Sequence, residues 1–160
     1  MVASIIDGLN SYFTFRMGGK LFAVNVGQLT KILELTKITK VPNSPKYFKG
    51  IINLFGDVIP VFDGRLKFGF QEAENTRETC ILIFAFEFDG QFYNSGITVD
   101  SVEKVLIFEP ELIRPALISE KEFNPEFVSG IATFNNESVI FLNIEKVFSE
   151  EEIKLIITVE

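Results

Sequence analysis

Few side chains in this chain could carry out chemistry, and none of them forms a recognisable catalytic set. The 160 residues include no histidine, which removes the commonest general base, the usual Ser-His and Cys-His pairs and most transition-metal sites. The single cysteine, Cys80, begins an apolar stretch, CILIFAF, so we expect a small core residue and not a nucleophile. We therefore expect a protein that is not an enzyme and that holds no metal and no cofactor.

The other candidate residues have structural explanations. Gly18-Gly19-Lys20 lacks the upstream glycine and the following Ser or Thr of a phosphate-binding loop, so it predicts a hairpin turn. The acidic run 150–152 stands where a terminal helix is expected to begin, and carboxylates stabilise that end of a helix. Asp63 and Asp100 follow apolar stretches and are expected to be caps or turn residues.

Composition narrows the class of protein and its surroundings. The apolar fraction is 47%, with 18 Phe, which is typical of a folded domain. The formal net charge is −7, which argues against nucleic acid as the main partner because phosphate binding needs a basic surface. A lone cysteine cannot form an internal disulfide, no apolar run is long enough to span a bilayer, and no signal peptide is visible. We expect a soluble protein of the cytoplasm.

The elements that must position any functional side chain are mostly β-strands. Hairpins are expected over residues 12–26, 48–63, 80–108 and 130–143. Their turns are predicted at pairs of residues that readily adopt positive φ, namely Gly18-Gly19, Gly56-Asp57, Asp89-Gly90 and Asn135-Asn136. Phe55 stands directly beside the second of these turns, where a polar side chain would be easier to solvate.

Helix is expected in two places. Residues 26–35 carry apolar side chains on one helical face, at Val26, Leu29, Ile32 and Leu33. Ser149 followed by Glu152 is a capping-box pattern, which predicts a C-terminal helix over 149–160. Asn143 can cap a short helical turn before it.

An internal repeat organises the chain. At a shift of 80 residues, the stretch that ends in FKGIINLFGDVIPVFDGRLKF aligns without a gap with the stretch that ends in FVSGIATFNNESVIFLNIEKVF. Matched positions include Pro45 with Pro125, Gly50 with Gly130, and Asp63 with Asn143. A second match, at a shift of 73, aligns AVNVGQLTKIL with GITVDSVEKVL, including Lys31 with Lys104. We expect a single domain over 1–160 with two similar, intertwined β-lobes, roughly 12–75 and 80–148, each of the size of a small closed barrel and sharing an interface.

Charge is unevenly distributed along the chain. Residues 31–49 contain five lysines and one acid, Glu34, whereas the last sixteen residues contain five glutamates and two lysines. Two explanations stay open: two solvated faces, or a basic docking face on the first lobe for an acidic protein partner.

With these motifs placed, the chain resembles the CheW family, the adaptor proteins of bacterial chemosensory arrays. YFTFRMGGKLFAVNV resembles the opening hairpin of the family, and PKYFKGIINLFGDVIPVFDGR its signature P-x-x-x-x-G-x-x-N-L-R-G-x-x-x-P-x-x-D-L-R. GITVDSVEKVLIFEPELIRPA and VIFLNIEKVF are similar to its second barrel and closing strand. The resemblance covers roughly residues 12–155.

The resemblance implies a fold and a function. The fold would be mostly β, with two packed five-stranded SH3-like barrels, a short internal helix and a C-terminal helix. The function would be a non-catalytic adaptor in two-component chemotaxis signalling. Its partners would be the tips of transmembrane chemoreceptors, bound in a groove, and the regulatory domain of the CheA histidine kinase, bound edge to edge. Such a protein would be a monomer by itself and peripheral to the inner membrane within receptor arrays.

The resemblance also implies which residues form the docking sites. The receptor groove would involve Leu29, Lys31, Ile32, Asn53, Phe55 and Gly56. The kinase and array contacts would involve Lys49, Val58 and Arg114. For Leu29, Ile32 and Val58 core packing is the alternative explanation, as it is for Phe55, and for Asn53 the alternative is support of the turn.

This chain departs from the family at three positions, two of them in the implied receptor groove. The family usually has Arg at Phe55, an acid at Lys31 and Leu at Gly64. If the usual Arg and acid pair with each other, replacing only one would strand a charge. Both are replaced here, so we interpret Phe55 and Lys31 as a joint exchange that alters partner specificity.

Two other classes of function stay open. One is a related adaptor in a signalling system that controls pili or gene expression. The other is a double barrel that binds a small molecule, or an unrecognised hydrolase, which the lack of histidine weakens.

Overall fold

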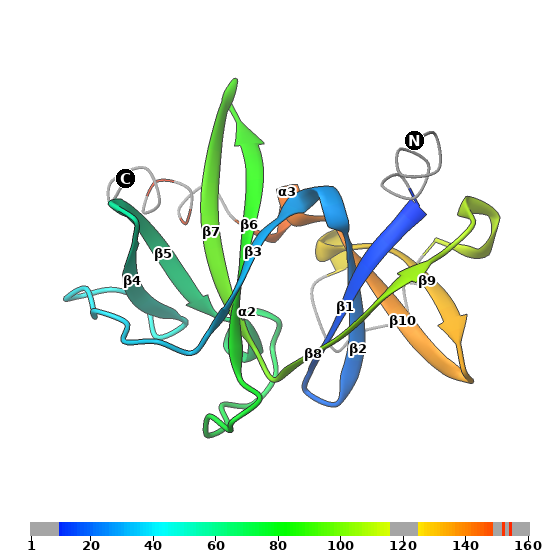
Figure 1. The fold of residues 1–160 in the computed structure, drawn as a ribbon, viewed down its shortest axis with the longest axis horizontal. Coiled ribbons are helices and arrows are strands. Elements are labelled where there is room, and N and C mark those ends of the chain that lie inside the picture. The colour runs from blue at the N-terminus through cyan, green and yellow to red at the C-terminus, as the bar shows by residue number, and fades with distance from the viewer. Residues whose placement is uncertain (1–9, 116–124, 149–151, 153, 155–160) are drawn as a thin grey trace.

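The computed structural model describes residues 10–115, 125–148, 152 and 154, and strands make up most of this part of the chain (Figure 1). The strands form two five-stranded sheets, as the predicted fold class requires. They are β1 (Ser11–Met17), β2 (Lys20–Asn25), β3 (Leu29–Glu34), β4 (Phe48–Leu54), β5 (Asp57–Asp63), β6 (Cys80–Phe88), β7 (Gln91–Val99), β8 (Ser101–Ile107), β9 (Val128–Phe134) and β10 (Glu137–Leu142).

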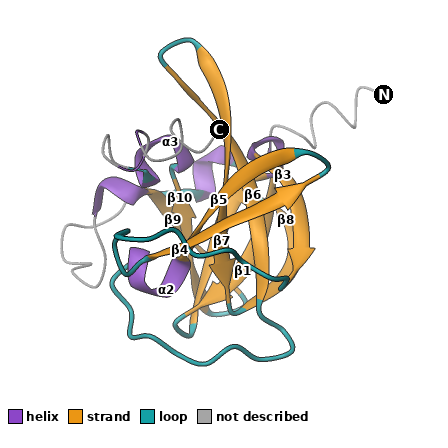
Figure 2. Cartoon of the chain, turned by 90° about the vertical axis from the view of Figure 1, so that its left-hand side faces the viewer, coloured by secondary structure: helices purple, strands orange, loops and turns teal. Residues whose placement is uncertain are grey.

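The helical elements that the structure describes from end to end are short. They comprise α2 (Gly64–Lys67), α3 (Ile144–Val147) and three 3₁₀ turns, Val26–Gln28, Pro110–Leu112 and Pro125–Phe127. Among the described residues, no helix is long and apolar enough to cross a membrane. The tip of the β6–β7 hairpin extends away from the rest of the fold (Figure 1, Figure 2).

Each sheet takes strands from both halves of the chain. Sheet A has the order β8-β1-β2-β10-β9 and sheet B has the order β3-β6-β7-β5-β4. If each strand of the first half is matched with the strand five places later, β1 with β6 and so on to β5 with β10, the order of one sheet becomes the order of the other. In both sheets a parallel pair joins the halves, β2 with β10 and β7 with β5. Each half therefore contributes its first two strands to the sheet of the other half.

This exchange distributes the strands of each repeat over both sheets. The ranges 12–75 and 80–148 follow the repeats of the sequence but not the two sheets, because β1–β2 and β6–β7 each lie in the other repeat's sheet. Local patterns identify a hairpin and its turn. They do not identify the strand that pairs with the hairpin's free edge, since parallel partners are joined by long connections.

A backbone bridge closes each sheet, and we call the closed sheets barrel A and barrel B. In barrel B, Thr39 follows β3 and exchanges two backbone hydrogen bonds with Ile51 of β4, at 2.9 and 2.8 Å. In barrel A, Arg114 follows β8 and makes the same exchange with Ile131 of β9, at 2.8 and 2.8 Å. The equivalent closures show that the repeat governs the fold.

Two repeated glycines permit these closures. Gly50 has a φ of 139°, and a Cβ there would overlap the backbone carbonyl of Thr39. A Cβ at Gly130 would lie 2.9 Å from the carbonyl oxygen of Arg114. The aligned glycines of the repeat are therefore explained by close approach of two backbones.

A further backbone hydrogen bond is repeated at the residue that precedes each of the short helices α2 and α3. The Asp63 N–H donates to the carbonyl of Tyr47 at 2.7 Å, and the Asn143 N–H donates to the carbonyl of Phe127 at 2.8 Å. The Asp63 side chain also caps α2 by accepting from the Leu66 N–H at 3.2 Å, as predicted. Among the described residues, the Asn143 side chain makes no such bond to α3.

The largest cluster of buried apolar residues joins the two barrels. One small cluster fills each barrel, for example around Val139 in barrel A and around Val61 in barrel B. The third cluster contains residues of both barrels and is rich in phenylalanine. For example, the ring centroids of Phe22, in β2, and Phe68, directly after α2, lie 5.8 Å apart. Because burying one such ring contributes about 1.5–3 kcal/mol, the barrels form one unit.

The predicted helix over 26–35 is wrong. Its first residues form a single 3₁₀ turn, capped by Asn25, and Leu29–Glu34 is strand β3. This strand pairs with β6, for instance Ile32 with Leu82. A short apolar pattern fits either element, and the long-range pairing with β6 decides between them.

The predicted C-terminal helix lies mostly outside the described residues, as does its capping residue Ser149. Residues 152 and 154 are described, and both are helical.

Closure of barrel B gives a first prediction. We expect Gly50→Ala to lower the free energy of unfolding by about 2–4 kcal/mol, because the new Cβ meets the fixed Thr39 carbonyl at a positive φ. Gly56→Ala is the matched control: its φ is 90° but the space around it is open, so we expect about 1–2 kcal/mol. Urea denaturation of both variants measures the difference, and equal losses would contradict the closure argument.

Candidate docking surface

The predicted receptor residues lie on β3 and on the β4–β5 hairpin of barrel B. The hairpin reverses at Phe55-Gly56, with φ of 51° and 90°. The turn was predicted one residue later, at Gly56-Asp57, so Phe55 lies within the turn and not beside it. Asn53 supports this turn, because its Oδ1 accepts from the Gly56 N–H at 3.1 Å.

Phe55 is not a core residue. Its side chain is 88% exposed, and its left-handed backbone costs a bulky residue about 1–2 kcal/mol. The second hairpin of the repeat offers an internal comparison. There Asn135 occupies the equivalent position with the same φ of 51°, a conformation that Asn tolerates well. The fold therefore does not require an aromatic residue in this turn.

Lys31 lies directly against Phe55. The Lys31 Nζ is 4.9 Å from the centroid of the Phe55 ring, a cation–π contact worth about 0.5–1 kcal/mol at an exposed site. In the other barrel Lys104 makes a related contact, with its Nζ 5.6 Å from the Phe134 ring. The two positions interpreted as a joint exchange therefore contact each other, between strand β3 and the β4–β5 turn of barrel B.

The remaining receptor candidates differ in exposure. Ile32 is 46% exposed, which removes core packing as its explanation. Leu29 is half-buried and packs against the cluster between the barrels. Both lie on strand β3 and not on a helix.

The three kinase and array candidates lie apart from one another. Val58 is half-buried in β5, opposite Asn53. Lys49 is in β4, and its Nζ lies 3.7 Å from the Asp63 carboxylate. Arg114 is exposed and belongs to the closing bridge of barrel A. Only Val58 adjoins the receptor candidates.

The lysine-rich segment is partly neutralised. Lys40, Lys46 and Lys49 line one surface depression together with Asp63 and Glu72. Lys46 forms an exposed ion pair with Glu72 at 3.2 Å. The excess of positive charge there is therefore smaller than the sequence indicates.

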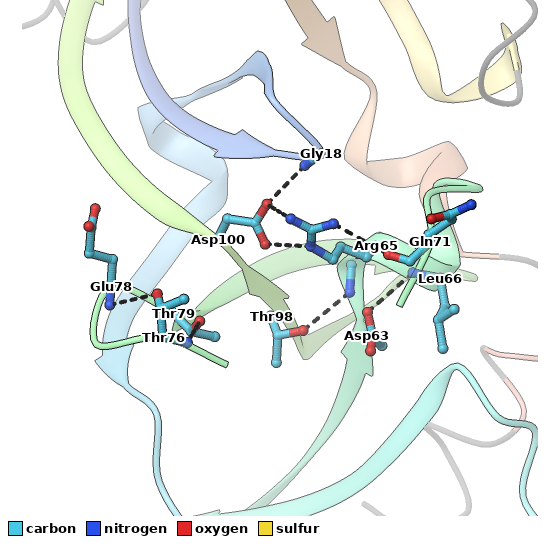
Figure 3. Close-up of polar contacts among 11 residues, drawn as sticks. Gly18, Asp63, Arg65, Leu66, Gln71, Thr76, Glu78, Thr79, Thr98 and Asp100 are labelled. Atoms are coloured by element: carbon cyan, nitrogen blue, oxygen red, sulfur yellow. Dashed lines mark hydrogen bonds and ion pairs between the residues drawn. The ribbon is translucent and has the colours of Figure 1, made fainter. Parts of the chain in front are cut away.

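An ion pair between the barrels was missed at the sequence level (Figure 3). The Arg65 guanidinium of α2 donates to both carboxylate oxygens of Asp100, at 2.8 and 2.6 Å. Asp100 lies between β7 and β8, and its carboxylate also accepts from the Gly18 N–H at 2.9 Å, in the β1–β2 turn of barrel A. A two-pronged arginine contact fixes geometry better than a lysine contact does.

The sequence predicts Asp100 only as a cap or a turn residue. The available signal is the charge of Asp100 at a strand end, opposite in sign to that of Arg65 in the short helix of the first repeat. Distance in the sequence hid the pairing.

Cys80 is buried, as predicted. Burial raises the pKa of its thiol above the ordinary value, and a protonated thiol is a poor nucleophile.

Comparison with known proteins gives a consistent result. A family model described as CheW-like domain matches residues 11–152. The chain is 30% identical to the chemotaxis protein CheW of Klebsiella aerogenes over 91% of this chain and 85% of that protein. It is 29% identical to the probable chemotaxis protein CheW of Rhizobium etli, over 94% and 95%. The crystal structure of the scaffolding protein TtCheW from Thermoanaerobacter tengcongensis is similar, with a TM-score of 0.78, 27% identity and 88% coverage of both chains.

The geometry of the turn gives a second prediction. We expect Phe55→Asn to leave the melting temperature unchanged or to raise it. Relief of the left-handed backbone, about 1–2 kcal/mol, should match or exceed the lost cation–π contact with Lys31, about 0.5–1 kcal/mol. Thermal unfolding followed by circular dichroism measures the change. A clear loss of stability would show that the exposed ring serves the fold.

Proposed function

This chain belongs to the CheW-like family, whose proteins are non-catalytic scaffolds, and on that premise we propose that it couples chemoreceptors to a CheA histidine kinase. In this role it binds the helical cytoplasmic tip of a transmembrane receptor and the regulatory domain of the kinase. It is a cytoplasmic monomer by itself and gathers at the inner membrane with its partners. The observation that carries the proposal is an exposed aromatic ring, Phe55, kept in a turn that disfavours it.

We assign the receptor groove to Leu29, Lys31, Ile32, Asn53, Phe55 and Gly56. A residue kept at a cost to the fold is expected to serve function, and Phe55 is such a residue, at a φ of 51° and 88% exposed. Ile32 offers a second exposed apolar side chain on the neighbouring strand β3. Exposed apolar anchors of this kind fit the apolar face of a partner helix.

We assign Phe55 and Lys31 together to receptor specificity. Where the family usually presents a cation in the turn, this chain presents a ring. The positive charge stands instead on β3, at Lys31, in contact with that ring. A receptor suited to this surface must place an apolar side chain against the ring.

We assign Lys49, Val58 and Arg114 to the kinase and to neighbouring units of the array. Lys49 and Val58 lie on the paired strands β4 and β5 of barrel B, and Arg114 belongs to the bridge that closes barrel A. Side chains that reach the surface of such strands can contact a second barrel of the same kind.

Two alanine variants test the division of partners. We expect Ile32→Ala to weaken binding of a receptor tip fragment about fivefold to tenfold, since truncating an interface anchor costs about 1 kcal/mol or more. We expect Arg114→Ala to weaken binding of the kinase regulatory domain to a similar degree. Isothermal titration with both partners from the same organism measures these effects. Arg77→Ala, at another exposed arginine, is the control, and the absence of any complex would count against the adaptor function.

A charge-restoring variant tests the specificity assignment. We expect Phe55→Arg to lower affinity for the native receptor fragment at least fivefold, because a solvated cation replaces the apolar contact and faces Lys31. Phe92→Arg, at an exposed phenylalanine in the β6–β7 hairpin, should leave affinity unchanged. Unaltered affinity of a folded Phe55→Arg protein would refute the role of Phe55.

A further inference from the structure

A buried ion pair joins α2 to the C-terminal part of the chain. The Lys67 Nζ donates to the Glu152 carboxylate at 2.6 Å, and the two side chains are only 6% and 3% exposed. Buried charges are costly to desolvate, and removing one partner leaves the other uncompensated. Neither the receptor surface nor the kinase surface proposed above includes these two residues.

Aromatic rings surround the ammonium group. The Lys67 Nζ lies 5.1 Å from the centroid of the Phe127 ring, 5.7 Å from that of Phe148 and 5.8 Å from that of Tyr47. Each ring presents its negative face to a cation. Burial still lowers the pKa of Lys67 below its ordinary value, and the hydrogen bond to Glu152 opposes that change. We call the three rings and Lys67 the lysine cage.

The repeat shows that the fold does not need a lysine at this place. Tyr47 and Phe127 are equivalent residues of the two repeats, so the cage lies where the repeats meet. The residue equivalent to Lys67 is Val147 of α3, which is fully buried. A charged residue in one repeat and an apolar one in the other indicates a role specific to Lys67. Its bonded partner, Glu152, lies beyond the end of the repeat.

The same short helix holds the junction between the barrels. α2 spans four residues, Gly64–Lys67, and carries Arg65, which clamps Asp100 and, through it, the Gly18 N–H of barrel A. Arg65 and Lys67 are two residues apart on one helical turn. A movement of α2 that lets an unpaired Lys67 reach water must therefore disturb the two-pronged geometry at Asp100.

We propose that Glu152, bound in the lysine cage, holds α2 in the position from which Arg65 clamps the two barrels together. Glu152 thereby acts on the inter-barrel junction at a distance, through α2. Release of Glu152 loosens the junction without opening either barrel. The device requires no binding partner, so it stands independently of the adaptor function.

Hydrogen exchange of the full-length chain, measured by NMR, tests the proposal at single amides. The reporter is the Gly18 N–H, which is bonded to Asp100. The references are the Ile51 and Ile131 N–H groups, which close barrels B and A at 2.8 Å. We expect Glu152→Gln to reduce protection at Gly18 about tenfold more than at the references, as local opening does. Glu145→Gln, at an exposed glutamate of α3, should change none of them.

The outcome that overturns the proposal is a Gly18 protection that is unchanged in Glu152→Gln, or that falls only in step with Ile51 and Ile131. In either case the ion pair does not act on the junction. A double variant, Lys67→Met with Glu152→Met, fills the cage without charge, and we expect it to keep Gly18 protection within about twofold of the native value.

A second pair of variants covers failure of Glu152→Gln to fold. Lys67→Met with Glu152→Ala leaves the cage partly empty but strands no charge. We expect it to lower Gly18 protection about tenfold relative to the Met–Met variant, since only the latter retains a docked side chain. Equal protection in the two would refute the docking role.

Discussion

The parallel pairing of β2 with β10 and of β7 with β5 is the constraint on which the rest of the structure depends. Through these two pairs each repeat lends its opening hairpin to the barrel of the other, so neither repeat can complete a barrel alone. The two exchanged hairpins, β1–β2 and β6–β7, both contribute side chains to the cluster that lies between the barrels. The phenylalanine-rich cluster that fills this space is larger than either barrel interior. Folding of one barrel is therefore inseparable from folding of the other.

The repeat makes this chain its own reference for deciding which residues serve the fold. Positions that match in type and contacts, such as Gly50 with Gly130, are explained by geometry common to both barrels. Positions that differ need another explanation. In the alignment of the two repeats, Phe55 corresponds to Asn135, and Lys67 corresponds to Val147. The first is an exposed ring in a strained turn, and the second is a charge buried at the cost of desolvation.

These asymmetric positions lie where the molecule meets something outside one barrel. Phe55 and Lys31 are exposed on the surface of barrel B, in its β4–β5 turn and on β3. Arg65 binds Asp100 and, through it, the turn of barrel A, and Lys67 binds Glu152 beyond the repeat. A scaffold protein with no chemistry of its own acts through the relative placement of its surfaces. The charged contacts of α2 add directional restraints to the strand pairing and apolar packing that join the barrels, because hydrogen-bonded ion pairs are directional.

The sequence by itself determined the hairpins, the internal repeat, the buried cysteine and the family. Each depends on residues close together or on positions matched by a fixed shift: paired turn residues, aligned Gly50 and Gly130, and the stretch that ends in Asp63 and Arg65. It also located Phe55 and Lys31 as the unusual positions, although it placed the turn one residue too late. Only the tertiary structure decided that Leu29–Glu34 is a strand, because its apolar spacing fits a helix as well and the pairing with β6 is long-range. The same holds for the exchange of hairpins between barrels and for the partners of Arg65 and Lys67. A local pattern records which face of an element is apolar, but it does not record which distant segment covers that face.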